Sequence, residues 1–116
     1  LAPTRLLDTR QTRPRVWPGG TVELANPVPG AASVVTNLTV TLADRRGFVT
    51  AYPAGTTRPE TSTINPAFHD HTLANLAITG VSTRGLAYYG LAGADVLIEN
   101  FRVGTAAKLV RFADER

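Results

Sequence analysis

The sequence contains no cysteine and no methionine, and only one of its 116 residues is tryptophan. Without cysteine, neither a disulfide nor a thiolate metal site can hold the fold together, which is unusual for a small extracellular domain. No apolar run approaches the roughly 20 residues of a membrane-spanning helix, so we expect no membrane partner. Hydrophobic residues make up 43% of the chain and charged residues 18%, a balance typical of a folded globular domain.

Positive charge is in slight excess, with a net charge of +3 and a sequence pI of about 10.0. The densest basic group is formed by Arg5, Arg10, Arg13 and Arg15, but Asp8 lies among them. Nucleic-acid binding usually needs a continuous basic face together with a reading motif or stacking aromatics. No such motif accompanies these arginines, so we predict no nucleic-acid partner.

The clearest strand pattern covers residues 34–42, where apolar and polar side chains alternate. This period of two is the mark of a strand with one buried face. A second short strand is predicted over residues 48–52, after a polar turn that ends at Gly47. We interpret the two strands as an antiparallel hairpin. The face predicted to be buried in the first strand comprises Val34, Thr36, Leu38, Val40 and Leu42.

Further strands are predicted over residues 73–79, 85–89 and 96–103, and the last two flank a glycine-containing turn. Residues 96–98 are apolar on both faces, as in a central strand covered on both sides. Within residues 73–79, one face carries Ala74, Leu76 and Ile78. Shorter strands are predicted over residues 5–9, 21–24, 61–65 and 108–112, with at most one helical turn over residues 106–110.

Many short strands separated by turns predict an all-β fold. We expect an antiparallel β-sandwich, jelly-roll-like, with residues 1–116 forming a single domain. One unit of a longer or tandem protein is an alternative that the sequence leaves open, in part because the chain starts at Leu1 and lacks methionine.

Catalytic and metal-binding patterns are sparse. No serine lies in a Gly-x-Ser-x-Gly motif and the acidic residues are scattered, so we predict that the protein is not an enzyme and needs no cofactor. His69 and His71 would share one face of a strand and could hold a metal, but no third ligand lies at a telling spacing. A polar surface turn is the favoured interpretation of this segment.

Asp8 and Arg10 are expected to lie on the same face of the first strand, with Arg5 on the opposite face. An Asp8–Arg10 ion pair with two hydrogen bonds would then stabilise the start of the domain. We therefore expect Arg5, Asp8 and Arg10 to be structural. A clamp for an anionic ligand is the functional alternative.

Four aromatic residues are candidates for ligand binding: Trp17, Tyr52, Tyr88 and Tyr89. Aromatic rings stack on the apolar faces of sugars, while a polar side chain such as Arg58 completes the recognition. Tyr88 and Tyr89 are adjacent, so only one of them can face the core of a strand. Packing at the margin of the core is an equally common role for such residues.

Three sequence motifs together resemble a β-domain of actinobacterial secreted proteins. They are PTRLLDTR at residues 3–10, GFVTAYPAGTTRP at residues 47–59, and TLANL at residues 72–76. The resemblance implies an all-β accessory module, often repeated in tandem and appended to secreted hydrolases and surface proteins. It carries over no catalytic residues.

The chain departs from this family at two positions. Ala54 and Ala87 stand where members commonly have cysteine, and their joint replacement suggests that the family's cysteines form a disulfide which this protein lacks. A disulfide-free version suits assembly in a reducing cytoplasm, as for a virion protein of an actinobacterial phage.

Two functions are therefore expected. The first is a non-catalytic extracellular or cell-surface module that binds a polysaccharide or cell-wall glycan. The alternative is a virion structural protein, a capsid decoration or tail module, whose partners are copies of itself or other virion proteins.

Overall fold

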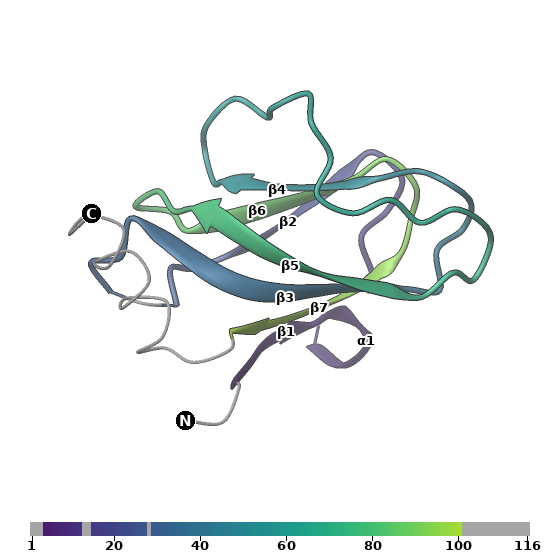
Figure 1. The fold of residues 1–116 in the computed structure, drawn as a ribbon, viewed down its shortest axis with the longest axis horizontal. Coiled ribbons are helices and arrows are strands. Elements are labelled where there is room, and N and C mark those ends of the chain that lie inside the picture. The colour runs from purple at the N-terminus through teal and green to yellow at the C-terminus, as the bar shows by residue number, and fades with distance from the viewer. Residues whose placement is uncertain (1–3, 13–14, 28, 101–116) are drawn as a thin grey trace.

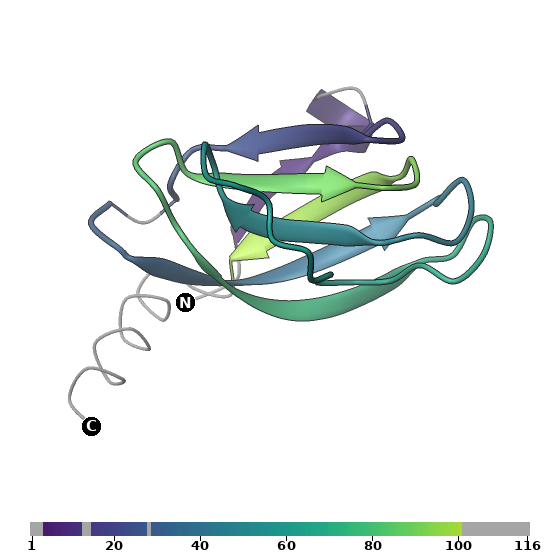
Figure 2. The ribbon, with the colours of Figure 1, turned by 90° about the horizontal axis from the view of Figure 1, so that it is seen from above.

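The computed structural model describes residues 4–12, 15–27 and 29–100 and shows two antiparallel sheets packed face to face (Figures 1 and 2). In chain order the elements are β1 (Thr4–Asp8), α1 (Thr9–Thr12), β2 (Gly20–Leu24), β3 (Ser33–Thr41), β4 (Val49–Pro53), β5 (Leu73–Gly80), β6 (Leu86–Gly90) and β7 (Asp95–Asn100).

The strand order is that of a jelly roll. One sheet has the order β1-β7-β3-β5 and the other has the order β2-β6-β4, so each connection between consecutive strands crosses from one sheet to the other. A jelly roll has eight strands in two four-stranded sheets. Here Ile64 pairs with Val49 as an isolated bridge, at the place beside β4 that the remaining strand would occupy. The structure confirms the predicted all-β sandwich.

The predicted hairpin of β3 and β4 is wrong. β3 pairs with β5 and β7, whereas β4 pairs with β6 in the other sheet. Leu42 has a positive φ of 54° and its side chain is 48% exposed, so the alternation that buries β3 ends before it. A period of two tells which face of a strand is buried, but it does not identify the strand's neighbours.

The remaining predictions of elements have mixed outcomes. β7 lies between β1 and β3 and is buried on both faces, as predicted, with Leu97 only 9% exposed. Residues 61–65 form only the bridge at Ile64, and the single turn α1 was not predicted. Residues 101–103 of the strand predicted over residues 96–103 lie outside the described residues. So do the strand predicted over residues 108–112 and the turn over residues 106–110.

The core fills the space between the two sheets. The inward side chains of β3 meet Leu86 and Tyr88 of β6, which are completely buried. Ala54 and Ala87 are also buried, so methyl groups fill both positions where the resemblance suggested a disulfide. The largest completely buried side chains are Tyr88, Leu38, Leu86, Ile98, Val34, Val40, Val49 and Val96.

Two hydroxyl groups are buried in this core, on Tyr88 of β6 and on Thr36 of β3. Neither oxygen has a hydrogen-bond partner of normal geometry among the described residues. Burial raises the pKa of the Tyr88 hydroxyl, and a weaker interaction with Thr36 opposes that rise. The two hydroxyls thus interact across the sandwich, but the contact falls short of a well-formed hydrogen bond.

Removal of both hydroxyls should therefore change the free energy of unfolding only slightly. We expect the double variant Thr36→Val/Tyr88→Phe to keep or slightly raise the free energy of unfolding, by up to about 1 kcal/mol, because two poorly satisfied polar groups leave the core. Urea unfolding measures the change, and Tyr88→Ala, expected to lose about 3–5 kcal/mol, checks that the site is packed. A double variant less stable by about 2 kcal/mol or more would show that the hydroxyls form a strong hydrogen bond.

Candidate functional site

The outer face of the three-stranded sheet carries a group of partly exposed aromatic residues. Because successive side chains of a strand point to opposite faces, Tyr88 faces the core and Tyr89 faces outward. Tyr89 pairs with Thr21 of β2 and Thr50 of β4, so it lies in the middle of this face. Tyr88, one of the predicted ligand-binding residues, is thereby corrected to a core residue.

Arg58 and Phe48 contact the Tyr89 ring. The guanidinium carbon of Arg58 lies 3.7 Å from the ring centroid, a cation–π contact. The Phe48 ring lies 6.1 Å away by centroids and is tilted by 45°. Arg58 forms no ion pair with a described residue, so its charge is available at the surface. We name this group, with Tyr52, the Tyr89 face.

Tyr52 completes the Tyr89 face through the alternation of β4. Thr50 is directly opposite Tyr89, and Phe48 and Tyr52 lie two residues before and after Thr50 on the same side of the strand. Both residues are partly buried. The face is therefore a partly exposed row of three aromatic side chains with one cation placed over the middle ring.

The segment that carries Arg58 is hydrogen-bonded to the edge of β4. The Thr50 hydroxyl donates to the Thr61 carbonyl over 2.9 Å, and the Ala51 amide donates to the Thr63 hydroxyl over 2.9 Å. The bridge between Val49 and Ile64 continues this attachment. These contacts hold the backbone that follows Arg58 against β4 and favour a fixed position for Arg58.

An ion pair lies at the other end of the same sheet. Arg84 donates to Glu23 over 2.6 Å, and its side chain passes over Gly55, where an added Cβ would come within 3.0 Å of the guanidinium. Gly55 also has a positive φ of 81°, so the turn favours glycine on both grounds. Arg84 is thus neutralised locally, in contrast to Arg58.

Trp17 is exposed and makes no ring contact with the other predicted ligand-binding aromatics among the described residues. Its side chain is 62% exposed in the connection between α1 and β2. Its carbonyl accepts a hydrogen bond from the Gly20 amide over 2.7 Å. The Gly19 amide in the same turn donates to the Gly90 carbonyl. No ring contact joins Trp17 to the described part of the Tyr89 face.

His69 and His71 lie in a turn rather than on a strand. Asp70 between them has a positive φ of 64°, so the two side chains do not follow strand alternation. The Nδ1 atom of His71 accepts the Ala67 amide over 2.8 Å, and its ring stacks on Phe68 with centroids 4.1 Å apart. Within residues 4–12, 15–27 and 29–100, no three His, Asp or Glu side chains gather as metal ligands would.

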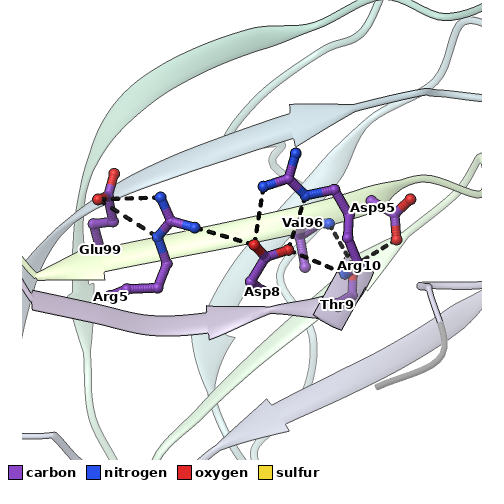
Figure 3. Close-up of polar contacts among 7 residues, drawn as sticks. All are labelled: Arg5, Asp8, Thr9, Arg10, Asp95, Val96 and Glu99. Carbon is purple, nitrogen blue, oxygen red and sulfur yellow. Dashed lines mark hydrogen bonds and ion pairs between the residues drawn. The ribbon is translucent and has the colours of Figure 1, made fainter. Parts of the chain in front are cut away.

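Asp8 is the centre of a polar cluster on the four-stranded sheet (Figure 3). Its carboxylate accepts Nε and Nη2 of Arg10 at 3.0 and 2.9 Å, the Arg10 amide at 3.0 Å, and Nη1 of Arg5 at 3.1 Å. The hydrogen bonds from Arg10 hold the pKa of Asp8 below its ordinary value, although burial opposes them. Because Asp8 is also the cap of α1, the carboxylate fixes the end of β1.

The expectation that Arg5 lies on the opposite face from Asp8 is wrong. The pairing of β1 with β7 shifts between Arg5 and Leu7, so this β-bulge brings Arg5 to the side of Asp8. Arg5 also pairs with Glu99 of β7 at 3.5 Å. Both arginines are thus held by carboxylates of the chain itself, which favours a structural role over an anion clamp.

Thr9 connects this cluster to β7. Its buried hydroxyl donates to Asp95 over 2.8 Å and accepts the buried Val96 amide over 2.9 Å (Figure 3). The cluster therefore joins β1 and α1 to the central strand of the sheet.

No protein-family model, curated protein or solved structure matches this chain. Among the described residues, no helix has the length and apolar character needed to cross a bilayer.

Sequence reasoning did not identify Phe48 as a member of the site. The sequence does carry a signal for it. In the strand predicted over residues 48–52, Phe48 is four residues before Tyr52 and therefore lies on the same face.

Proposed function

We propose that this domain is a non-catalytic accessory module that binds a polysaccharide or cell-wall glycan at its Tyr89 face. The observation that carries the proposal is the stacking of Arg58 on Tyr89 between two further surface aromatics. Such a row offers apolar contact to the carbon–hydrogen faces of successive sugar rings, so it suits a polysaccharide.

Arg58 has no carboxylate partner among the described residues, and its charge favours an acidic glycan. A guanidinium can form two parallel hydrogen bonds with one carboxylate or phosphate group, while its plane stays on the Tyr89 ring. Uronic acids and phosphate-bearing wall polymers share this chemistry. The resemblance of the sequence to secreted actinobacterial β-domains supports the same function, at an extracellular or cell-surface location.

The proposal is tested by retention of the purified domain on insoluble glucan, chitin, an insoluble polyuronate and intact actinobacterial cell walls. We expect saturable retention on at least one acidic matrix, weakened by salt because part of the affinity is ionic. Trp17→Ala should be retained like the natural sequence, since among the described residues the ring contacts of Tyr89 are with Phe48 and Arg58 and not with Trp17. Absence of saturable retention on every matrix would refute the proposal.

A virion structural protein is the second candidate. The observation that favours it is the exposure of Leu76 and Ile78 on β5, since exposed apolar surface often marks contacts between proteins. The partners would be copies of this chain or other virion proteins. Saturable glycan retention that depends on Tyr89 would count against this candidate, whereas a stable assembly without glycan retention would favour it.

A further inference from the structure

β5 is an edge strand with little of the usual protection. The connection between β4 and β5 reaches it at one place, where the Asn75 side chain donates to the Thr63 carbonyl over 3.0 Å. Among the described residues, no backbone hydrogen bond is formed on the outer edge of β5. It pairs only with β3 among the described strands, and its eight residues, LANLAITG, include no charged residue and no proline. Edge strands of natural monomers are commonly protected by charges, proline, bulges or covering segments. The opposite edge of the same sheet, β1, follows that rule, because it carries the bulge and the charged cluster of Arg5 and Asp8.

The side chains of β5 make this edge apolar on its outer face. Ile78 is 72% exposed and Leu76 is 52% exposed. Their partners on β3 are Val35 and Asn37, so the neighbouring strand adds no charge to this part of the face. The outcome is an uncharged strip that combines an open backbone edge with large apolar side chains.

We propose that β5 pairs with β5 of a second copy of this chain, in antiparallel orientation. Two identical antiparallel strands are related by a two-fold axis, so each donates and accepts the same backbone hydrogen bonds. The strip has no net charge and therefore gives no repulsion between copies. It also offers no charge that would select a different partner. The four-stranded sheets of both copies would join into one continuous sheet.

The alternation of side chains restricts the register of this pairing. Residues opposite one another in an antiparallel pair share a face, so an outward residue must meet an outward residue. One register sets Leu76 opposite Leu76 of the second copy and Ala74 opposite Ile78. The other central register sets Leu76 opposite Ile78. In both, Leu76 and Ile78 of the two copies form one apolar cluster over the shared sheet.

The size of the contact indicates a reversible dimer. Eight strand residues extend over about 27 Å, and an edge contact of that length falls short of a standard protein interface. We therefore expect an equilibrium between monomer and dimer that depends on concentration. This inference does not rest on glycan binding, because β5 and the Tyr89 face belong to different sheets.

Sedimentation analysis from about 10 µM to about 1 mM tests the inference, a range that brackets weak protein association. The natural sequence should shift from monomer towards dimer, and Ile78→Lys or Leu76→Lys should remain monomeric at the highest concentration. Trp17→Lys is the matched control, since it also places a lysine at an exposed large apolar residue. It should dimerise like the natural sequence.

Hydrogen exchange gives a second, local measurement. Dimerisation through this edge should slow the exchange of β5 amides at high concentration and leave β2 and β4 unchanged. A natural sequence that is monomeric over the whole range would overturn the proposal. So would a dimer that survives both β5 substitutions in folded protein, or protection that appears on another strand.

Discussion

Replacement of Asp8 by asparagine is expected to lower the midpoint of thermal unfolding by on the order of 10 °C. The carboxylate accepts hydrogen bonds from two guanidinium groups and from the Arg10 amide. A neutral amide has only one acceptor oxygen, and its NH₂ group would face guanidinium donors. Because the cluster also fixes β1 against the central strand β7, its loss should weaken one side of the sandwich.

The same substitution should change the dependence of stability on pH. The pKa of Asp8 is lower in the folded state than its ordinary value of 3.8, mainly because of Arg10. The resulting stabilisation is complete above the unfolded-state pKa and disappears as the pH falls through the folded-state pKa. We expect the natural sequence to lose stability below about pH 4, and Asp8→Asn to lose less over the same range.

Thermal unfolding followed by circular dichroism at several pH values measures both effects. Glu99→Gln is the control, because it removes only the more exposed ion pair with Arg5 and should change the midpoint by at most a few degrees. A midpoint for Asp8→Asn within that small range would contradict a stabilising role for the cluster. If the natural sequence and Asp8→Asn lost equal stability in acid, Asp8 would not be the group responsible for the pH dependence.

Replacement of Tyr89 by alanine is expected to weaken glycan retention at least tenfold. The substitution removes the central ring of the row and the support on which Arg58 rests. Tyr89→Phe should preserve most of the retention, because the ring and its stacking remain. Unfolding midpoints of both variants should establish that the β6 strand is intact.

Arg58→Gln separates the ionic part of this interaction from the apolar part. The variant should lose affinity for an acidic glycan and show little remaining effect of salt, while weak retention on the aromatic row persists. Arg84→Gln is a matched control, because Arg84 is already paired with Glu23 on the same sheet face. Equal effects of the two substitutions would show that only the overall charge matters.

The sequence predicted the strands more fully than their arrangement. Alternation in residues 34–42 identified β3 and most of its buried face, because burial on one side of a strand leaves a period of two. It could not show that β3 and β4 lie in different sheets, since neighbours in a jelly roll are distant in sequence. The same pattern places Leu42 in the core, because a change of backbone conformation leaves no mark in the alternation.

The site was predictable in its residue types and less so in its geometry. Adjacent Tyr88 and Tyr89 had to face opposite sides, but only the position of the second sheet decides which is buried. Arg58 reaches Tyr89 from a long connection whose course depends on hydrogen bonds to β4. Likewise, the bulge that brings Arg5 to Asp8 arises from pairing with β7 and not from local sequence.

Glycan binding at the Tyr89 face can be followed residue by residue in a titration of the ¹⁵N-labelled domain with a soluble acidic oligosaccharide. We predict saturable shifts of amide signals in β4, in β6 around Tyr89 and near Arg58, with the signals of β1 and β5 unchanged. Shifts confined to another surface, or no shifts with any oligosaccharide of the retained class, would contradict glycan binding at this face.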